Sequence, residues 1–425
     1  MVWRKLAFWA FAMAFPLPLV LTYDELQAEP PSLRIDIFLG MFAYAWWLLA
    51  ILLSVRPPWL ERLVGLRSIY GLHGMLGVLA IVAAYLHHDQ AYAGNALARN
   101  LGNWAFWLAL GLLFYSVFFM SGWLVDRSRL VHRMKQTLEV VLRRQVSLWI
   151  HRLNLVVVLM IFVHAHLLVR VNQHFALMVL FDLYTVITLG FYVWKKWIAR
   201  DTYLTGRVVG NEARGASTRV LSVALDHEAT KVQPGDSFFL RFEGSRAVGR
   251  EWHPFSVTDD DRHTLTFTIS QHGDYTRALT SLEVGTRVRL EGPFGRFDKI
   301  ARDLDPDTPL VFLGMGAGVA PLLSLTAAHH TARDIHLLWA ARTDHDAYFR
   351  EALAGYQAAA GGKLQVTTSV GRFRRDDLTT TLSPDAVARG AFFIVGPNPA
   401  VLANQRLLRR MGVSRTRIHH ERLTM

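Results

Sequence analysis

The sequence predicts a multi-domain membrane protein: a six-helix transmembrane bundle, then a small antiparallel β-barrel, then an α/β domain. Three observations lead to this prediction. Of the 425 residues, 52% are hydrophobic, and long apolar runs with few charges fill only residues 1–200. Residues 201–304 consist of short alternating strands between turn residues, a pattern typical of a small barrel. Residues 305–425 follow the order strand, glycine loop, helix, strand, which indicates an α/β domain.

The first region contains runs long enough to cross a membrane, since a helix needs about 20 apolar residues for this. These runs are residues 5–23, 35–55, 69–88, 104–124, 147–169 and 174–194. The first run follows Arg4 and Lys5 as a signal peptide would. No small-residue cleavage site follows it, so we interpret it as a helix.

Basic residues predict the orientation of the bundle. Lys and Arg outnumber Asp and Glu by 46 to 34, which gives a formal charge of +12. One side of the predicted membrane carries Arg4, Lys5, Arg56, Arg62, Arg67, Arg127, Arg129, Arg133, Lys135, Arg143, Arg144, Lys195, Lys196 and Arg200. The other side carries Arg34, Arg99 and Arg170 beside acidic residues. The positive-inside rule therefore predicts a multi-pass protein of the cell (inner) membrane, with both termini in the cytoplasm. Basic patches interleaved with aromatic residues are absent, so no nucleic-acid partner is expected.

Cysteine is absent, and histidine is abundant. The chain has no Cys and 18 His. The absence of Cys excludes disulfides, iron–sulfur clusters, thiolate catalysis and covalent c-type haem attachment. Any metal must therefore be held by nitrogen or oxygen ligands, which directs attention to the histidines.

Two of the apolar runs carry histidines at both ends. The third run contains His73 and His87, and the fifth contains His151, His164 and His166. One imidazole from each of two helices can sandwich a haem iron, so the pattern predicts two b-type haems. His73 and His87 are about 21 Å apart on an ideal helix and share a face.

Spacing alone does not choose the ligand pair of the fifth run. An ideal helix places His151 and His164 about 140° apart, whereas His151 and His166 are about 60° apart. Both His164 and His166 therefore stay open as ligands. Hydrogen-bonded interior histidines, or a histidine-lined transport path with a regulatory reductase domain, are alternative interpretations.

A glycine-rich turn follows the predicted strand 309–313. Gly314, Gly316 and Gly318 precede a helix that is expected to begin near Pro321. Such a turn lets backbone N–H groups approach a phosphate at a helix N-terminus. The next strand ends in Arg342 and Thr343, and an arginine there suits the 2′-phosphate of NADPH, where NADH sites usually have an acidic residue.

Together these features resemble the NADPH oxidase and ferric reductase superfamily, and in particular a compact prokaryotic member. Members are transmembrane flavocytochromes b with a ferredoxin-reductase-like FAD and NADP module. The resemblance covers nearly the whole chain. It implies that His73 and His151 hold an inner haem and that His87 and His164 hold an outer haem. The family tolerates a 13-residue step in its fifth helix, which favours His164 over His166.

The resemblance also implies cofactor-binding residues in the second half. His253, Pro254, Phe255 and Ser256 match the flavin motif, in which Phe255 packs on the isoalloxazine ring and Ser256 bonds near its N5 atom. These two residues would be the catalytic pair. The FAD pyrophosphate segment is matched by Gly273, Asp274, Tyr275 and Thr276. The nicotinamide phosphate loop is matched by Gly314 to Pro321, and the later nicotinamide-side turn by Gly396 and Pro397.

The chain departs from this family at two places. Val395 stands where many members have Cys, and the chain ends at Met425 without the aromatic residue that often covers the flavin. NADH is therefore a possible second donor. We see no EF-hand loop or proline-rich docking tail, so no obligatory activating subunit is expected.

The expected activity is electron transfer from cytoplasmic NADPH, through FAD and two b-type haems, to an extracytoplasmic acceptor. Dioxygen, giving superoxide, is the favoured acceptor, because His88, His166 or Arg99 could provide a positively biased position. A ferric chelate, a quinone and a periplasmic redox partner are the alternatives. An alternative function for the whole protein is a flavin reductase that is merely anchored to the membrane.

Overall fold

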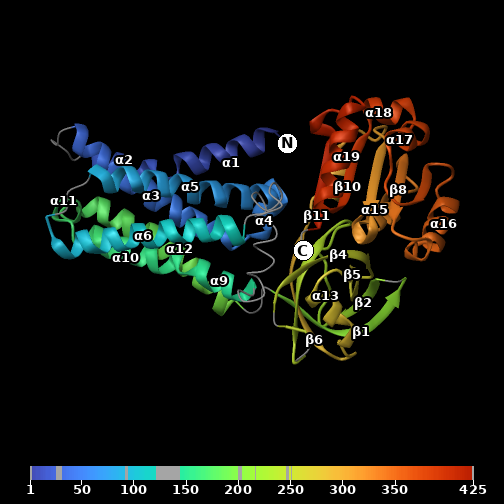
Figure 1. The fold of residues 1–425 in the computed structure, drawn as a ribbon, viewed down its shortest axis with the longest axis horizontal. Coiled ribbons are helices and arrows are strands. Elements are labelled where there is room, and N and C mark those ends of the chain that lie inside the picture. The colour runs from blue at the N-terminus through green and yellow to red at the C-terminus, as the bar shows by residue number, and fades with distance from the viewer. Residues whose placement is uncertain are drawn as a thin grey trace. The chain divides into compact units, whose positions relative to one another are not determined.

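The computed structural model describes residues 2–24, 31–90, 94–120, 144–199, 203–215, 217–245, 248–249 and 251–423. The chain divides into two compact units, Met1–Arg200 and Asp201–Met425. The first unit is helical, and the second combines a barrel with an open sheet (Figure 1).

The first unit is a bundle of apolar helices that run alongside one another (Figure 1). Its longer helices are α1 (Val2–Ala14), α2 (Leu17–Asp24), α3 (Pro31–Ser54), α5 (Leu66–Gln90), α6 (Ala96–Phe119), α9 (Arg144–Arg152), α10 (Asn154–His166) and α12 (Phe175–Val193). Short segments are α4 (Pro58–Val64), α11 (Val169–Asn172) and a π-helical turn, Trp194–Ile198.

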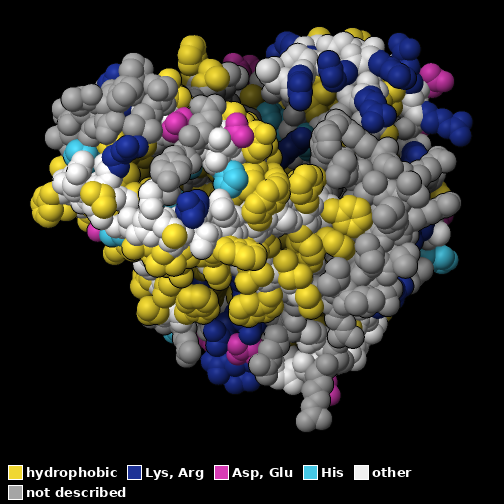
Figure 2. Space-filling model, turned by 60° about the vertical axis from the view of Figure 1, so that its left-hand side comes forward, with side chains coloured by type: hydrophobic (Ala, Val, Ile, Leu, Met, Phe, Trp, Pro, Cys, Tyr) yellow, Lys and Arg dark blue, Asp and Glu magenta, His cyan; other side chains and the backbone are white. Residues whose placement is uncertain are grey.

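Within the described residues, six stretches are long and apolar enough to cross a membrane. They are Leu6–Tyr23, Arg34–Ser54, Leu66–Asp89, Ala96–Phe119, Val146–His166 and Phe175–Ile198. Large hydrophobic side chains such as Phe114, Val186 and Ile187 are exposed on these helices. Figure 2 shows hydrophobic side chains gathered over a broad area of the surface. Helices whose exposed faces are also hydrophobic are unfavourable in water and require an apolar environment.

The first and fourth predicted runs differ from the observed helices. The first is interrupted at Phe15 and Pro16, because a proline in a helix interior cannot donate an N–H group. The fourth begins earlier than predicted, at Ala96, where the Asn95 side chain accepts hydrogen bonds from the N–H groups of Leu97 and Ala98. The end of that predicted run, 121–124, lies outside the described residues.

The second unit begins with a closed six-stranded barrel. Its strands are β1 (Leu204–Arg214), β2 (Thr218–Leu225), β3 (Ser237–Glu243), β4 (His253–Asp260), β5 (Thr264–Ser270) and β6 (Arg287–Phe294), in the order β1-β2-β5-β4-β3-β6. Helix α13 (Asp274–Ala278) follows β5. Alternate residues such as Phe238, Leu240 and Phe267 fill the interior. Strand β4, which starts at the predicted flavin motif, completes the barrel.

The second part of this unit is a five-stranded parallel sheet covered on both faces. Its strands are β7 (Leu310–Met315), β8 (Ile335–Ala341), β9 (Leu364–Val370), β10 (Ala391–Pro397) and β11 (Ile418–Leu423). The strand order is β11-β10-β7-β8-β9, so the chain adds strands on one side of β7 first and then on the other, and the switch point lies between β7 and β10. Helices α14 (Phe297–Asp303), α15 (Ala320–His329) and α16 (Arg350–Ala359) cover one face. Helices α17 (Arg375–Thr381), α18 (Pro384–Arg389) and α19 (Asn398–Arg410) cover the other. Ligands of such sheets bind at the carboxyl ends of the strands, where the order reverses.

Candidate redox-cofactor sites

Two histidines from different helices face each other near one end of the bundle. His73 lies on α5 and His151 on α9, and their ring centroids are 5.9 Å apart. The Nδ1 atom of His73 is 2.9 Å from the carbonyl oxygen of Ala50, and that of His151 is 2.9 Å from Oγ of Ser116. Both rings are therefore oriented through Nδ1, which leaves Nε2 for another partner.

A second pair lies further along α5 and on α10, the helix that follows α9. The ring centroids of His87 on α5 and His164 on α10 are 6.4 Å apart. Each Nδ1 donates to a backbone carbonyl oxygen at 2.7 Å, His87 to Asp36 and His164 to Ala98. A carbonyl can only accept, so Nδ1 carries the proton and Nε2 carries the lone pair.

These two pairs fit the requirements of bis-histidine iron ligation. Imidazoles bound on opposite sides of one metal, each at about 2 Å, would have their ring centroids about 6 Å apart. Metal-bound histidines also usually donate their second ring N–H to a carbonyl or a carboxylate. Both pairs meet the distance condition, and three of the four rings have a carbonyl acceptor. Among the described residues there is no cluster of three or more metal-ligating side chains, and a bis-histidine haem requires none.

The break between α9 and α10 reduces the angular offset between His151 and His164, which both face histidines of α5. Leu153 forms a turn in which its N–H bonds the carbonyl oxygen three residues back, on Ile150. Such a turn winds more tightly than an α-helix and changes the helical phase. Asn154 stabilises it by donating to the carbonyl oxygen of His151 at 2.7 Å.

The neighbouring histidines are engaged elsewhere. His166 bonds the carbonyl oxygen of Phe162 through Nδ1 at 2.8 Å, and its Nε2 lies 3.2 Å from the Asp182 carboxylate. His88 bonds the Asn103 side chain at 2.9 Å. Among the histidines that the structure describes, neither ring has a histidine partner of the kind that His164 has in His87.

Glycines provide space around these histidines. A Cβ atom at Gly102 would lie 3.0 Å from the His164 ring, and one at Gly40 would lie 3.2 Å from the His87 ring. In contrast, a Cβ atom at Gly71, Gly74 or Gly77 on α5 would have no neighbour within 4 Å. The first two glycines therefore allow a helix to approach a histidine ring, and the other three leave open space beside α5.

Gly102→Ala tests this close approach. The added methyl group displaces the His164 ring. If His87 and His164 hold a haem, that haem should be lost or distorted, measured as haem per protein and in the reduced spectrum. Gly111→Ala on the same helix is the control, because its Cβ atom would have no neighbour within 4 Å. Equal haem content and equal spectra in the two variants would contradict the role of Gly102.

The predicted flavin motif forms the start of β4. Ser256 is buried and pairs with Ser237 of β3, while Phe255 is half-buried and packs against the barrel core. Pro254, opposite Phe239, is exposed. The His253 ring stacks on Tyr275 at a centroid distance of 3.5 Å, and its Nε2 is 3.1 Å from the Glu251 carboxylate. Burial raises the pKa of Tyr275, so this phenol stays neutral. The two predicted FAD segments are thus in direct contact.

The second FAD segment forms a capped turn. The Thr276 hydroxyl accepts hydrogen bonds from the N–H groups of His272 and Gly273, both at 3.0 Å. Asp274 is exposed and pairs with Arg277 at 2.9 Å. The Thr276 hydroxyl thereby orders the start of α13, and its expected contact with the FAD pyrophosphate stays a prediction.

The glycine loop after β7 contacts the turn after β10. A Cβ atom at Gly318 would lie 2.3 Å from the Val395 carbonyl oxygen, and one at Gly396 would lie 2.8 Å from Met315 Cβ. Gly314 approaches Val319 within the loop, and Gly316 has a φ of +57°. Pro321 lies in the first turn of α15, and Pro397 ends β10 with its side chain exposed. The predicted nicotinamide-side residues therefore lie together at the carboxyl ends of β7 and β10.

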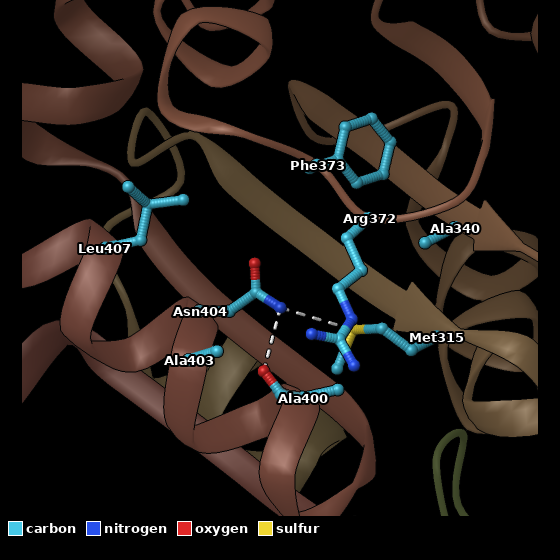
Figure 3. A pocket seen from close by; sticks show the side chains of 8 residues that line it. All are labelled: Met315, Ala340, Arg372, Phe373, Ala400, Ala403, Asn404 and Leu407. Carbon is cyan, nitrogen blue, oxygen red and sulfur yellow. Dashed lines mark hydrogen bonds between the residues drawn. The ribbon is translucent and has the colours of Figure 1, made fainter.

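A small groove opens at the carboxyl ends of β7, β8 and β9 (Figure 3). Its lining residues are Met315, Ala340, Arg372, Phe373, Ala400, Ala403, Asn404 and Leu407. The Asn404 amide donates to the Ala400 carbonyl oxygen at 2.9 Å and points toward Met315. Its apolar walls, with one amide and one guanidinium, suit an aromatic base attached to an anionic group.

Sequence reasoning singled out Arg342 but not Arg372, which lines the groove. The pairing of Ala341 with Val370 brings the ends of β8 and β9 together, so Arg342 and Arg372 leave the sheet at the same edge. Thr343 donates from its hydroxyl to the Asp346 carboxylate at 2.9 Å. The signal that could have revealed Arg372 is the segment Gly371-Arg372-Phe373-Arg374 directly after a buried parallel strand.

The barrel and its motifs define a class of protein. Residues 206–298 match the family model described as "Oxidoreductase FAD-binding domain". The second unit is therefore a FAD-binding oxidoreductase module, with the barrel and parallel sheet of the ferredoxin-reductase fold.

Curated relatives match parts of this chain. The electron transfer subunit of dihydroorotate dehydrogenase B (NAD(+)) from Caldanaerobacter subterraneus subsp. tengcongensis is 24% identical over 211 residues, which are 49% of this chain and 78% of the relative. The reductase component of propane 2-monooxygenase from Rhodococcus jostii is 29% identical over 160 residues, which are 34% of this chain and 42% of the relative.

Solved structures are similar at lower identity. The cytochrome P450 reductase GcoB of Amycolatopsis is 23% identical with a TM-score of 0.46, over 52% of this chain and 70% of that chain. A flavohemoglobin from Malassezia yamatoensis is 15% identical with a TM-score of 0.48, over 92% of this chain and 96% of that chain.

Proposed function

We propose that this protein is a transmembrane NAD(P)H oxidoreductase that moves electrons from cytoplasmic NADPH, through FAD and two b-type haems, to an extracytoplasmic acceptor. The observation that carries the proposal is the presence of two facing histidine pairs, His73 with His151 and His87 with His164. They lie within apolar helices of the same chain as a FAD-binding oxidoreductase domain.

The apolar helices support a membrane location. Six candidate spans in the described residues precede the FAD-binding domain. The basic residues that the positive-inside rule counts, such as Arg56, Arg62 and Lys196, fall in the connections on one predicted side. We propose the cell (inner) membrane, with both termini in the cytoplasm.

The residues of the chain would orient the cofactors and insulate them. FAD, when bound, supplies a centre that accepts two electrons together and releases them singly. Phe255 would lie against its isoalloxazine ring and Ser256 would donate a hydrogen bond to it, while the capped turn at Gly273 holds the adjoining segment. Glu251 and Tyr275 fix the His253 ring from two sides, so that the start of β4 keeps one conformation. The four paired histidines would hold haem, which supplies one-electron redox chemistry.

The groove in Figure 3 would take the adenosine part of the nucleotide. A 2′-phosphate beside the base would then face the edge that carries Arg342 and Arg372. Arginine suits this role, because its planar guanidinium can form two parallel hydrogen bonds to a phosphate.

Arg372→Ala should raise the KM for NADPH by roughly 10-fold, because a charge-assisted hydrogen bond contributes about 1.5–3 kcal/mol. The KM for NADH should change little, since NADH has no 2′-phosphate. Anaerobic reduction of FAD in the full-length protein measures both constants. Arg410→Ala, an exposed arginine of α19 that does not line the groove, is the matched control. A parallel rise in both KM values would show that Arg372 does not recognise the phosphate.

We propose dioxygen as the acceptor, with superoxide as the product. Arg99 is exposed at the end of α6 that carries Ala98, the partner of His164, and His88 lies beside His87. Reduction of dioxygen, a ferric chelate and a quinone by reconstituted protein, compared under NADPH and NADH, tests this choice. Cytochrome c reduction that superoxide dismutase abolishes is the expected result. Faster reduction of the chelate or the quinone, without superoxide, would replace dioxygen with that acceptor.

A further inference from the structure

His272 links the two halves of the second unit, although no motif includes it. It follows β5 and directly precedes Gly273, so it borders the predicted FAD pyrophosphate segment. Its backbone N–H donates to the Thr276 hydroxyl at 3.0 Å, and its Nδ1 is 2.7 Å from the Ser270 hydroxyl oxygen. The ring is therefore fixed by its own loop at two points.

The other ring nitrogen meets the α/β domain. Nε2 of His272 is hydrogen-bonded to Nη2 of Arg342, which follows β8. A guanidinium can only donate, so Nε2 must be the acceptor and the ring proton must lie on Nδ1, where it donates to Ser270. Burial and the neighbouring Arg342 both lower the pKa of His272, which keeps the ring in this neutral form.

This contact limits the positions that Arg342 can adopt. An exposed arginine has many rotamers, and fixing them at the moment of ligand binding reduces affinity. One hydrogen bond to His272 uses one of the five guanidinium N–H donors, which leaves the others for an anion. The same edge of the sheet carries the phosphate-facing side of the groove, because Ala341 pairs with Val370.

We propose that His272 is a positioning residue for nucleotide selection: from the FAD side of the module, it holds Arg342 in the orientation that binds the 2′-phosphate of NADPH. This inference rests on the proposed function, in which NADPH is the donor and Arg342 faces its phosphate. It adds that selectivity depends on a side chain of the FAD domain that does not touch the nucleotide.

The experiment measures anaerobic FAD reduction by NADPH and by NADH in the full-length protein, and reports the ratio of the two KM values. His272→Ala should raise the NADPH KM about 3- to 10-fold while the NADH KM changes much less. His272→Gln keeps an acceptor oxygen for Arg342 and should restore most of the selectivity. FAD content is measured in each variant, because a merely structural defect would lower it and would shift both KM values together.

His263→Ala is the matched control. His263 is exposed at the opposite end of the same strand, in the turn between β4 and β5, so its removal should leave the ratio unchanged. In an Arg342→Ala background, His272→Ala should have no further effect, because the residue that it positions is gone.

The experiment distinguishes failure of the positioning role of His272 from failure of the proposed nucleotide site. If Arg342→Ala lowers NADPH selectivity and His272→Ala does not, the positioning role is wrong and the proposed nucleotide site stands. If Arg342→Ala itself leaves the ratio of KM values unchanged, Arg342 does not bind the 2′-phosphate, and the inference fails together with that part of the proposed function.

Discussion

His87→Ala or His164→Ala abolishes reduction of the external acceptor while FAD is still reduced by NADPH. Each variant would remove one of the two proposed axial ligands of a haem. We therefore expect loss of one haem and a fall in acceptor reduction of at least about 100-fold, more than the roughly 10- to 100-fold effect of losing an outer-sphere partner. The FAD-binding domain lies in a separate compact unit, so its reaction with NADPH should remain. Haem content and acceptor kinetics measure the first effect, and stopped-flow absorbance of FAD measures the second.

His166→Ala is the decisive comparison for this prediction. His166 lies on the same helix, two residues beyond His164, but its two ring nitrogens bond the Phe162 carbonyl and the Asp182 carboxylate. We expect the variant to keep both haems and most of its acceptor activity. Loss of a haem in His166→Ala with retention in His164→Ala would reverse the assignment of the ligand. Unchanged acceptor reduction in His87→Ala and His164→Ala would instead indicate a reductase that is merely anchored to the membrane.

Gly318→Ala should have the second large effect, which is slower transfer of electrons from NADPH to FAD. Its Cβ atom would lie 2.3 Å from the Val395 carbonyl oxygen, so either the glycine loop or the end of β10 must move by roughly 1 Å. A misplacement of this size costs about 100-fold in rate when it moves a bound reactant. We therefore expect FAD reduction by NADPH to fall by about two orders of magnitude, measured anaerobically.

Gly355→Ala is the control for that substitution. Gly355 lies within α16, and a Cβ atom there would have no neighbour within 4 Å. Alanine in a helix interior is favoured over glycine by about 1 kcal/mol, so this variant should be as stable as the parent or more stable. If Gly318→Ala binds FAD normally and is reduced at the parental rate, the glycine loop does not hold the nucleotide.

Much of the architecture could be predicted from hydrophobic patterning, since length and composition alone indicate which runs form apolar helices. The departures have local causes. Pro16 interrupts the first predicted helix because it lacks an N–H group. The fourth predicted run begins too late, at residue 104, because the polar first turn of α6, around Arg99 and Asn100, hides the start of the helix.

Some of the candidate site residues could likewise be predicted from the sequence, and others could not. Spacing on ideal helices could not choose between His164 and His166, because the turn at Leu153 changes the helical phase between His151 and both of these residues. The Asn154 side chain donates to the His151 carbonyl oxygen in that turn, a contact that the apolar pattern does not reveal. Arg372 was missed because its proposed role depends on the pairing of β8 with β9, which only the folded sheet provides. The contact of His272 with Arg342 joins residues 70 positions apart.

The spectrum of the purified, full-length protein under anaerobic NADPH tests the central claim most directly. If His73 with His151 and His87 with His164 each hold a haem, the protein contains two haems per chain. NADPH then reduces both, which gives the bands of b-type haem in the reduced-minus-oxidised spectrum. A well-folded, FAD-containing protein without haem would contradict the account and would leave a histidine-lined transport path as the better explanation of the bundle.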